Sequence, residues 1–317
     1  MSSERILGLH HVTGAASSAQ RDHDFYTGVL GLRLVKRTIN HETADHWHLF
    51  YGDREGRPGT VMTNFLFDGL PVPPARPGRG SIAAVSFSVP SPALDRWRQR
   101  LVAAGHQVEE RADRFGEPVL SFRDPSGIPG ELIGCGDDRG AASELSPSVR
   151  GFHSVTLVSR LPELTLEFFT GLLGARVVAR EQERTRLAFA EGGPGRQIDL
   201  LEINDGPWAC FGLGALHHVA FTAPDVEAME RLWRRLSGAG LIVTDLRDRK
   251  WFHSMYLTEP GGINVEISNR EPGFTVDESL EELGTTLQLP AQWADRRAEI
   301  EARLPPLDFS SGAPTDR

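Results

Sequence analysis

The sequence predicts an α+β protein of four βαβββ modules, arranged in two tandem domains and followed by a C-terminal helical tail. Four segments of the chain repeat one succession of a strand-like opening, a helix-like pattern and further strand-like runs. Pro/Gly-rich or polar stretches separate some of these segments. A chain of 317 residues, 39% of them hydrophobic, is also long enough to bury the cores of two domains.

Each repeat opens on a short run rich in β-branched or aromatic residues, which is typical of a strand. The four openings are 9–13, 82–89, 151–157 and 216–221. One βαβββ unit by itself leaves a hydrophobic sheet face and a sheet edge uncovered, so we expect the units to pair.

The helix of each repeat carries start or stop signals. In the fourth repeat, Asp225 is placed to cap a helix whose apolar residues form one stripe and which ends at Gly238. In the second repeat the expected cap is Ser91. The helices of the first and third repeats are expected to end at Gly31 and Gly174.

Two separators divide the chain into larger parts, the Pro/Gly-rich stretch 71–80 and the polar stretch 137–148. The boundary between the second and third repeats lies near residue 145. The predicted parts are an N-terminal domain over 5–140, a C-terminal domain over 148–272 and a tail over 273–317 with a helix-like run at 293–304 that packs on the outside.

Composition narrows the class of protein. The formal net charge is -9 and no basic stripe is interleaved with aromatic residues, which argues against nucleic acid or an anionic membrane as partner. Apolar runs are too short to span a bilayer, and residues 1–5 lack the features of a secretory signal. Two cysteines, Cys135 and Cys210, are too few for a disulfide framework, which favours the cytoplasm. Sheet edges favour a homo-oligomer.

Candidate metal ligands recur at equivalent places in the repeats. On the first strands, His11 corresponds to His218, whereas the second and third repeats have Ala84 and Ser154 there. On the last strands, which follow a Pro-Gly/Ser-Gly turn, Glu266 corresponds to Glu131.

Strand alternation places His218 and Glu266 on the polar face of one curved sheet. His11 completes a two-histidine, one-carboxylate triad if the first repeat meets the fourth. Such a triad leaves adjacent positions of an octahedral ion open, which suits non-haem Fe(II). A site at Glu131 has only His11 as a companion and is one ligand short.

Several motifs resemble those of a known family. The repeats resemble the paired modules of the vicinal-oxygen-chelate superfamily, which includes glyoxalases, bleomycin-resistance proteins and extradiol dioxygenases. Over residues 5–307 the chain is more closely similar to ring-cleaving dioxygenases of the hydroquinone 1,2-dioxygenase type. The motifs are 9–13 (LHHVT), 25–36 (FYTGVLGLRLVK), 48–53 (HLFYGD), 59–63 (GTVMT), 150–154 (RGFHS), 216–218 (LHH), Asp248, Arg249, Tyr256 and 260–266 (PGGINVE).

The resemblance implies a glyoxalase/bleomycin-resistance/dioxygenase fold. It also implies Fe(II), or Mn(II) in some members, held by His11, His218 and Glu266, and a small hydroquinone- or catechol-type substrate opened with O2.

The resemblance further assigns roles to four residues. Thr13 would position O2 or a substrate hydroxyl, Arg249 would stabilise developing negative charge, and Tyr256 or His217 would act as acid or base. Simple alternation places His217 on the opposite sheet face from His218, which a bulge or a strand-end position would reconcile.

Two other functions remain open from the sequence. One is a glyoxalase-like, metal-dependent isomerase or lyase, although such enzymes usually use more carboxylate or amide ligands. The other is a metal-free small-molecule-binding resistance protein, which needs no ligand triad. His46 and His48, which share a strand face, are expected to be structural or to line a pocket.

Overall fold

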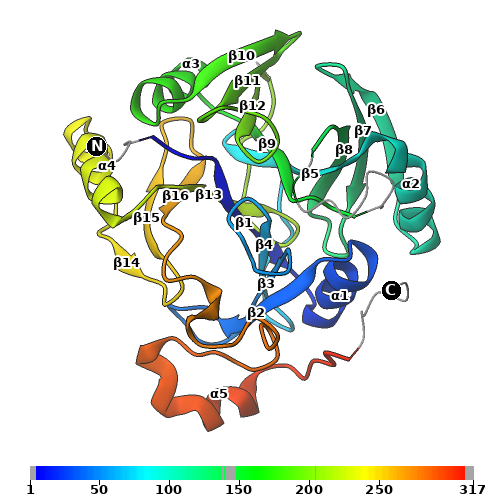
Figure 1. Ribbon diagram of the computed structural model, residues 1–317, viewed down its shortest axis with the longest axis vertical. Coiled ribbons are helices and arrows are strands. Elements are labelled where there is room, and N and C mark those ends of the chain that lie inside the picture. Colours follow the sequence, from blue (N-terminus) through cyan, green and yellow to red (C-terminus); the bar gives the residue numbers. More distant parts are fainter. Residues whose placement is uncertain (1–4, 138, 140–147, 204, 311–317) are drawn as a thin grey trace.

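A computed structural model describes residues 5–137, 139, 148–203 and 205–310. These residues contain a sheet of 16 strands (Figure 1). The four modules contribute β1 (Leu9–Ala16), β2 (Arg33–Ile39), β3 (Trp47–Gly52) and β4 (Val61–Leu66); β5 (Ser81–Pro90), β6 (Val108–Arg114), β7 (Glu117–Arg123) and β8 (Pro129–Cys135); β9 (Phe152–Val158), β10 (Arg176–Glu181), β11 (Arg184–Ala188) and β12 (Gln197–Leu201); and β13 (Leu216–Thr222), β14 (Arg247–Asp248), β15 (His253–Thr258) and β16 (Asn264–Ser268).

Every module has the same strand order. Its first strand pairs in parallel with its last strand, and the last strand pairs with the third in antiparallel fashion. A helix follows the first strand and lies within the long crossover that joins the parallel first and last strands. The predicted fold class, α+β with four βαβββ modules and a C-terminal helix, is confirmed.

The first strands of the modules lie side by side and join the modules together. β1 pairs with β13 and β5 pairs with β9, both antiparallel. The first module therefore meets the fourth, as the predicted triad requires, and the second meets the third (Figure 1). Because the two halves of the chain share one sheet, the division into domains over 5–140 and 148–272 stays a prediction.

The helices follow most of their sequence signals. The Asp225 carboxylate accepts a hydrogen bond from the Ala228 amide (2.7 Å) and caps α4, which ends at Gly238 as predicted. The prediction that Ser91 caps a helix is wrong, because Ser91 is itself the first residue of a 3-10 turn, and neither that turn nor the helix after it has a side-chain cap. The helical segments are α1 (Ala19–His23) with a π-helix (Asp24–Val29), a 3-10 helix (Ser91–Ala93) with α2 (Leu94–Ala103), α3 (Pro162–Glu167) with a π-helix (Phe168–Leu172), α4 (Val226–Gly238), 3-10 helices Phe274–Val276 and Ala291–Arg296, and α5 (Arg297–Arg303).

In the described part of the chain, no helix has the length and apolar character that crossing a membrane demands. The tail packs on the first module, with α5 beyond β2 at the outside of the molecule (Figure 1). Its anchor is Lys36, which is fully buried and bonds Asp277 (2.6 Å), Glu278 and the Phe274 carbonyl (3.0 Å). Phe274 packs against Phe252, which brings the tail next to the site described below.

Candidate metal centre

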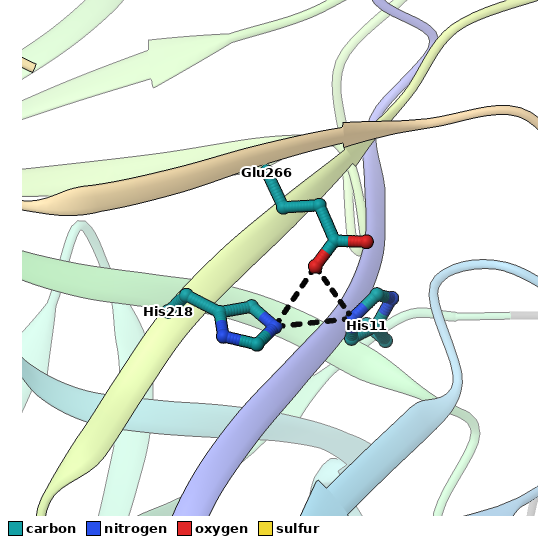
Figure 2. Close-up of side chains that lie close together, drawn as sticks. All are labelled: His11, His218 and Glu266. Atoms are coloured by element: carbon teal, nitrogen blue, oxygen red, sulfur yellow. Dashed lines mark hydrogen bonds and ion pairs between the residues drawn. The ribbon is translucent and has the colours of Figure 1, made fainter. Parts of the chain in front are cut away.

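Three buried side chains from three strands face one another where the first and fourth modules meet. His11 lies on β1, His218 on β13 and Glu266 on β16. The two imidazole Nε2 atoms are 3.2 Å apart, and Glu266 Oε2 is 3.3 Å from that of His11 and 3.0 Å from that of His218. Figure 2 shows the two rings and the carboxylate pointing toward one another. Residues more than 200 positions apart thus supply one compact set of donor atoms.

Two irregularities of the β1–β13 pairing set the directions of the histidines. The register slips once between Leu9 and Val12 and once after the Thr13–His218 pair, where His217 is the extra residue of β13. Such bulges re-aim side chains, and they are frequent next to active sites. The second slip removes the conflict that simple alternation raised, because His217 and His218 can both face the cavity.

The Glu266 carboxylate is held at both oxygens. The Ser254 and Ser268 hydroxyls donate to Oε1, Ser268 at 2.8 Å, while Oε2 faces the histidines. Burial alone would raise the pKa of Glu266, but His11 and His218 outweigh burial and hold this pKa well below its usual range. The carboxylate is therefore ionised, oriented and aimed at two imidazole nitrogens, which is the state in which it binds a metal ion.

His10 fixes the proton on the neighbouring His11 ring. Burial and His11 lower the pKa of His10 to about 3, so His10 is neutral, and its Nε2–H donates to the Asn269 carbonyl (2.9 Å). Its Nδ1 must then accept, and the group 2.9 Å away is His11 Nδ1. The His11 proton thus resides on Nδ1, which leaves the Nε2 lone pair free to bind a metal ion.

A cavity of about 340 Å³ opens beside the triad. Aromatic rings provide much of its wall, and cationic and acidic groups lie among them. Its lining residues are His11, Asn40, His41, Glu42, His48, Phe50, Phe65, His217, His218, Thr244, Arg247, Arg249, Trp251, Phe252, Tyr256 and Glu266. An apolar cavity with a few convergent polar groups is typical of a site for a small molecule.

The four residues predicted to assist catalysis lie around the triad. His217, Arg249 and Tyr256 line the cavity, with Arg249 Nε donating to the Tyr256 hydroxyl (3.0 Å). Thr13 is fully buried behind them, and its hydroxyl is 2.9 Å from His218 Nε2. Burial and Glu266 raise the pKa of Tyr256, so its hydroxyl keeps its proton and can donate.

Comparison with known proteins places this arrangement in a family. The model of the Glyoxalase/Bleomycin resistance protein/Dioxygenase superfamily matches residues 8–132 and 151–267. The chain belongs to this superfamily. It is 36% identical to "Putative ring-cleaving dioxygenase MhqA" of Bacillus subtilis, over 96% of this chain and 99% of the relative. It is also 36% identical to "Chlorohydroquinone/hydroquinone 1,2-dioxygenase" of Sphingobium indicum, over 94% and 95%.

Solved structures agree with this membership. A "putative dioxygenase" from Bacillus subtilis superposes with a TM-score of 0.90 at 33% identity, covering 97% of this chain and 99% of the other. Glyoxalase I from Zea mays shares the fold. It superposes with a TM-score of 0.62 at 16% identity, covering 83% of this chain and 92% of the other. The predicted family and the predicted enzyme class, a ring-cleaving dioxygenase, are confirmed.

The equivalent place where the second and third modules meet is built differently. Glu131 corresponds to Glu266, but the Arg114 guanidinium binds both of its oxygens at 2.7 Å, and Ser86 donates to it at 2.6 Å. A guanidinium charge therefore occupies the place beside this carboxylate that a metal ion would need. This pairing excludes Glu131 as a partner of His11 and agrees with the sequence argument that such a site lacks ligands.

Several residues of the site were not predicted as functional. His10, Ser254 and Ser268 hold the ligands, and only the position of His10 beside His11 offered a signal. Glu42 comes from the loop before β3, lines the cavity and bonds Arg249 of the fourth module. His48 lines the cavity as expected, whereas the His46 ring is hydrogen-bonded to Asp45 (2.5 Å).

Replacing His10 by phenylalanine should weaken metal binding by about 10- to 100-fold, the usual effect of removing a group that orients a ligand. The ring shape is kept, but His11 loses the acceptor that fixes its proton on Nδ1. Isothermal titration of the apoprotein with Fe(II) under argon measures this change. His23→Phe is the matched control, because His23 is buried on α1 and does not line the cavity. Equal affinity of both variants would contradict the proton assignment.

Proposed function

We propose that the protein is a non-haem Fe(II)-dependent dioxygenase that opens the ring of hydroquinone- or catechol-type aromatics with O2. The observation that carries this proposal is the convergence of His11, His218 and Glu266 beside an aromatic-walled cavity. Two imidazoles and one carboxylate are the donor set of non-haem Fe(II) oxygenases, and Mn(II) accepts the same donors. The sequence and architecture of the named relatives support the reaction class.

The donor atoms fit a divalent ion. Their separations of 3.0–3.3 Å place three lone pairs around one point. The carboxylate is ionised and the His11 proton is fixed on the far nitrogen. When bound, the ion would lower the pKa of a ring hydroxyl and offer adjacent open positions to the diol and O2.

His217 is suited to donate a hydrogen bond into the cavity. If His218 binds the ion through Nε2, its proton resides on Nδ1, which is 2.7 Å from His217 Nδ1. Burial and His218 lower the pKa of His217 to about 3, so this ring is neutral. Its Nδ1 accepts a hydrogen bond from the His218 Nδ1–H, and its own proton is on Nε2. His217 is therefore a hydrogen-bond donor toward an oxygen of the substrate.

Tyr256 and Arg249 form a second polar pair in the wall of the cavity. Tyr256 lies directly across from Glu266 in the β15–β16 ladder, so its hydroxyl is held near the ligands. Arg249 donates to that hydroxyl and adds a positive charge where negative charge develops on the opening ring. Phe50, Phe65 and Phe252 would contact the ring faces, while the buried Thr13 hydroxyl orients groups beside His218.

Turnover by a Tyr256→Phe variant should fall about 100-fold or more, because a positioned acid or base contributes roughly 10²–10⁴-fold. Tyr256 is not one of the three ligands, so the iron content should equal that of the wild type. Oxygen-electrode rates at saturating hydroquinone, divided by bound iron, measure the effect. A rate within twofold of the wild type would remove Tyr256 from the reaction.

Metal analysis and O2 uptake test the proposed function. Protein purified under argon should retain about one iron or manganese per chain and should consume O2 with hydroquinone or catechol, with a new absorbance from the ring-opened product. A glyoxalase-like isomerase would act on a hemithioacetal without O2 uptake. A resistance-type binding protein would bind aromatic compounds with no metal. Either result would overturn the proposal.

We also propose that the enzyme works in the cytoplasm as a homo-oligomer. Both cysteines, Cys135 and Cys210, are free thiols, which suits a reducing compartment. The strand β10 ends the main strand path and leaves an edge that a second copy could cover, whereas the tail pairs with the edge of β2 at Arg37 and Leu287. Light scattering after size-exclusion chromatography tests the assembly, and a monomer at micromolar concentration would refute it.

A further inference from the structure

A carboxylate from the first module crosses the rim of the cavity to two arginines of the fourth. Glu42 Oε1 is 2.9 Å from an Arg247 guanidinium nitrogen and 3.1 Å from one of Arg249. All three residues line the cavity. The three side chains form an ion cluster, Glu42–Arg247–Arg249, that joins the loop before β3 to β14 and the turn after it.

The cluster lies on a continuous path from solvent to the candidate metal ligands. The side chain of Glu42 is 62% exposed, that of Arg249 is 15% exposed and that of Glu266 is 1% exposed. Arg249 bonds Glu42 at the outer end and the Tyr256 hydroxyl at the inner end. A ring that enters the cavity from solvent past this cluster therefore meets two positive charges that the negative charge of Glu42 offsets.

The charge balance of the cavity depends on Glu42. Among the described lining residues the cations are Arg247 and Arg249, and the carboxylates are Glu42 and Glu266. Glu266 faces the histidines, so Glu42 is the carboxylate that opposes the two guanidinium groups. Arg249 holds the pKa of Glu42 below its usual range even though partial burial acts against this, so Glu42 stays charged at neutral pH.

We propose that Glu42 is a specificity-determining residue that selects uncharged diols over ring carboxylates. This inference rests on the proposed function and names its substrate class. A guanidinium is a strong receptor for a carboxylate because its N–H groups match the two oxygens. Glu42 Oε1 already accepts a hydrogen bond from one nitrogen of each guanidinium and places a negative charge beside both. A dihydroxybenzoate must displace Glu42 or face that charge, whereas hydroquinone or catechol meets neither obstacle.

The experiment compares hydroquinone with 2,5-dihydroxybenzoate in the iron-loaded enzyme. In Glu42→Gln, which keeps the size of the side chain, the ratio of kcat/KM for the carboxylate to kcat/KM for hydroquinone should rise about tenfold. The rise should shrink at high ionic strength, because salt screens charges near the surface. Glu55→Gln is the matched control: it makes the same change of net charge on an exposed loop outside the cavity.

Binding gives a second readout that does not depend on turnover. Under argon, calorimetric titration of the metal-loaded protein should show tighter binding of 2,5-dihydroxybenzoate to Glu42→Gln than to the wild type. An unchanged or lower ratio and affinity in Glu42→Gln would overturn the inference, as would an equal rise in Glu55→Gln. If the wild type neither binds hydroquinone nor consumes O2 with it, the proposed function itself fails and the inference fails with it.

Discussion

We expect Glu266→Ala to lose both its metal ion and its O2 uptake. Removing a group that merely orients a ligand costs about 10- to 100-fold in metal affinity, so removing the ligand itself should cost at least about 100-fold. Two neutral imidazoles would remain, without the negative charge that draws a divalent ion into a buried site. Metal content by plasma emission spectroscopy and O2 uptake with hydroquinone measure the two losses.

Glu131→Gln is the matched control for this variant. Glu131 has the corresponding position on the last strand of the second module, but it binds Arg114. Its replacement should leave metal content unchanged. Circular dichroism of both variants checks that the sheet is intact. A folded Glu266→Ala protein with full iron content and normal turnover would contradict the ligand assignment.

The largest expected effect on stability is that of Lys36→Met. Lys36 is fully buried and is bonded to Asp277 and Glu278, so its loss leaves the buried Glu278 without its cation and leaves Asp277 with Lys250 as a partner. Breaking a buried ion pair by removing one partner costs about 3–5 kcal/mol of unfolding free energy. Urea denaturation followed by fluorescence should show a clearly lower midpoint. Because the tail's Phe274 supports Phe252 beside the His10 and His11 rings, metal binding should weaken as well.

Lys250→Met provides the comparison on the same tail carboxylate. Lys250 is also paired with Asp277, at 2.7 Å, but its side chain is about one-third exposed. Ion pairs that solvent reaches contribute about 0–1 kcal/mol. Equal urea midpoints for the two lysine variants would show that the buried cluster does not hold the tail.

The repeats could be predicted from the sequence because each carries local signals. Three signals recur at similar spacing: a short strand-like opening, a helix with a cap and a closing glycine, and a turn before the last strand. All of them act within one module. Asp225, Gly238 and the equivalence of His11 with His218 are examples. The meeting of the first and fourth modules followed from chemistry, because the modules between them have Ala84 and Ser154 where histidine is needed.

Other features depend on tertiary contacts that a local sequence pattern does not show. The register slip at His217 depends on how β13 pairs with β1, and strict alternation has no means to show it. The pairing of Glu131 with Arg114 joins two strands of one module, and the placement of Glu42 joins a loop to β14. In the sequence nothing distinguishes Lys36 from an exposed lysine, because its burial depends on the tail that packs over it.

We expect one divalent ion to bind where the first and fourth modules meet. Crystals of protein loaded with Fe(II) under argon, measured on both sides of the iron absorption edge, test it directly. We predict one strong anomalous peak bonded to His11 Nε2, His218 Nε2 and a Glu266 oxygen, near 2.0–2.2 Å as for N and O ligands of such metals. A peak at the other group of potential ligands, Glu117, Cys135 and His153, or no peak at the triad, would contradict the claim.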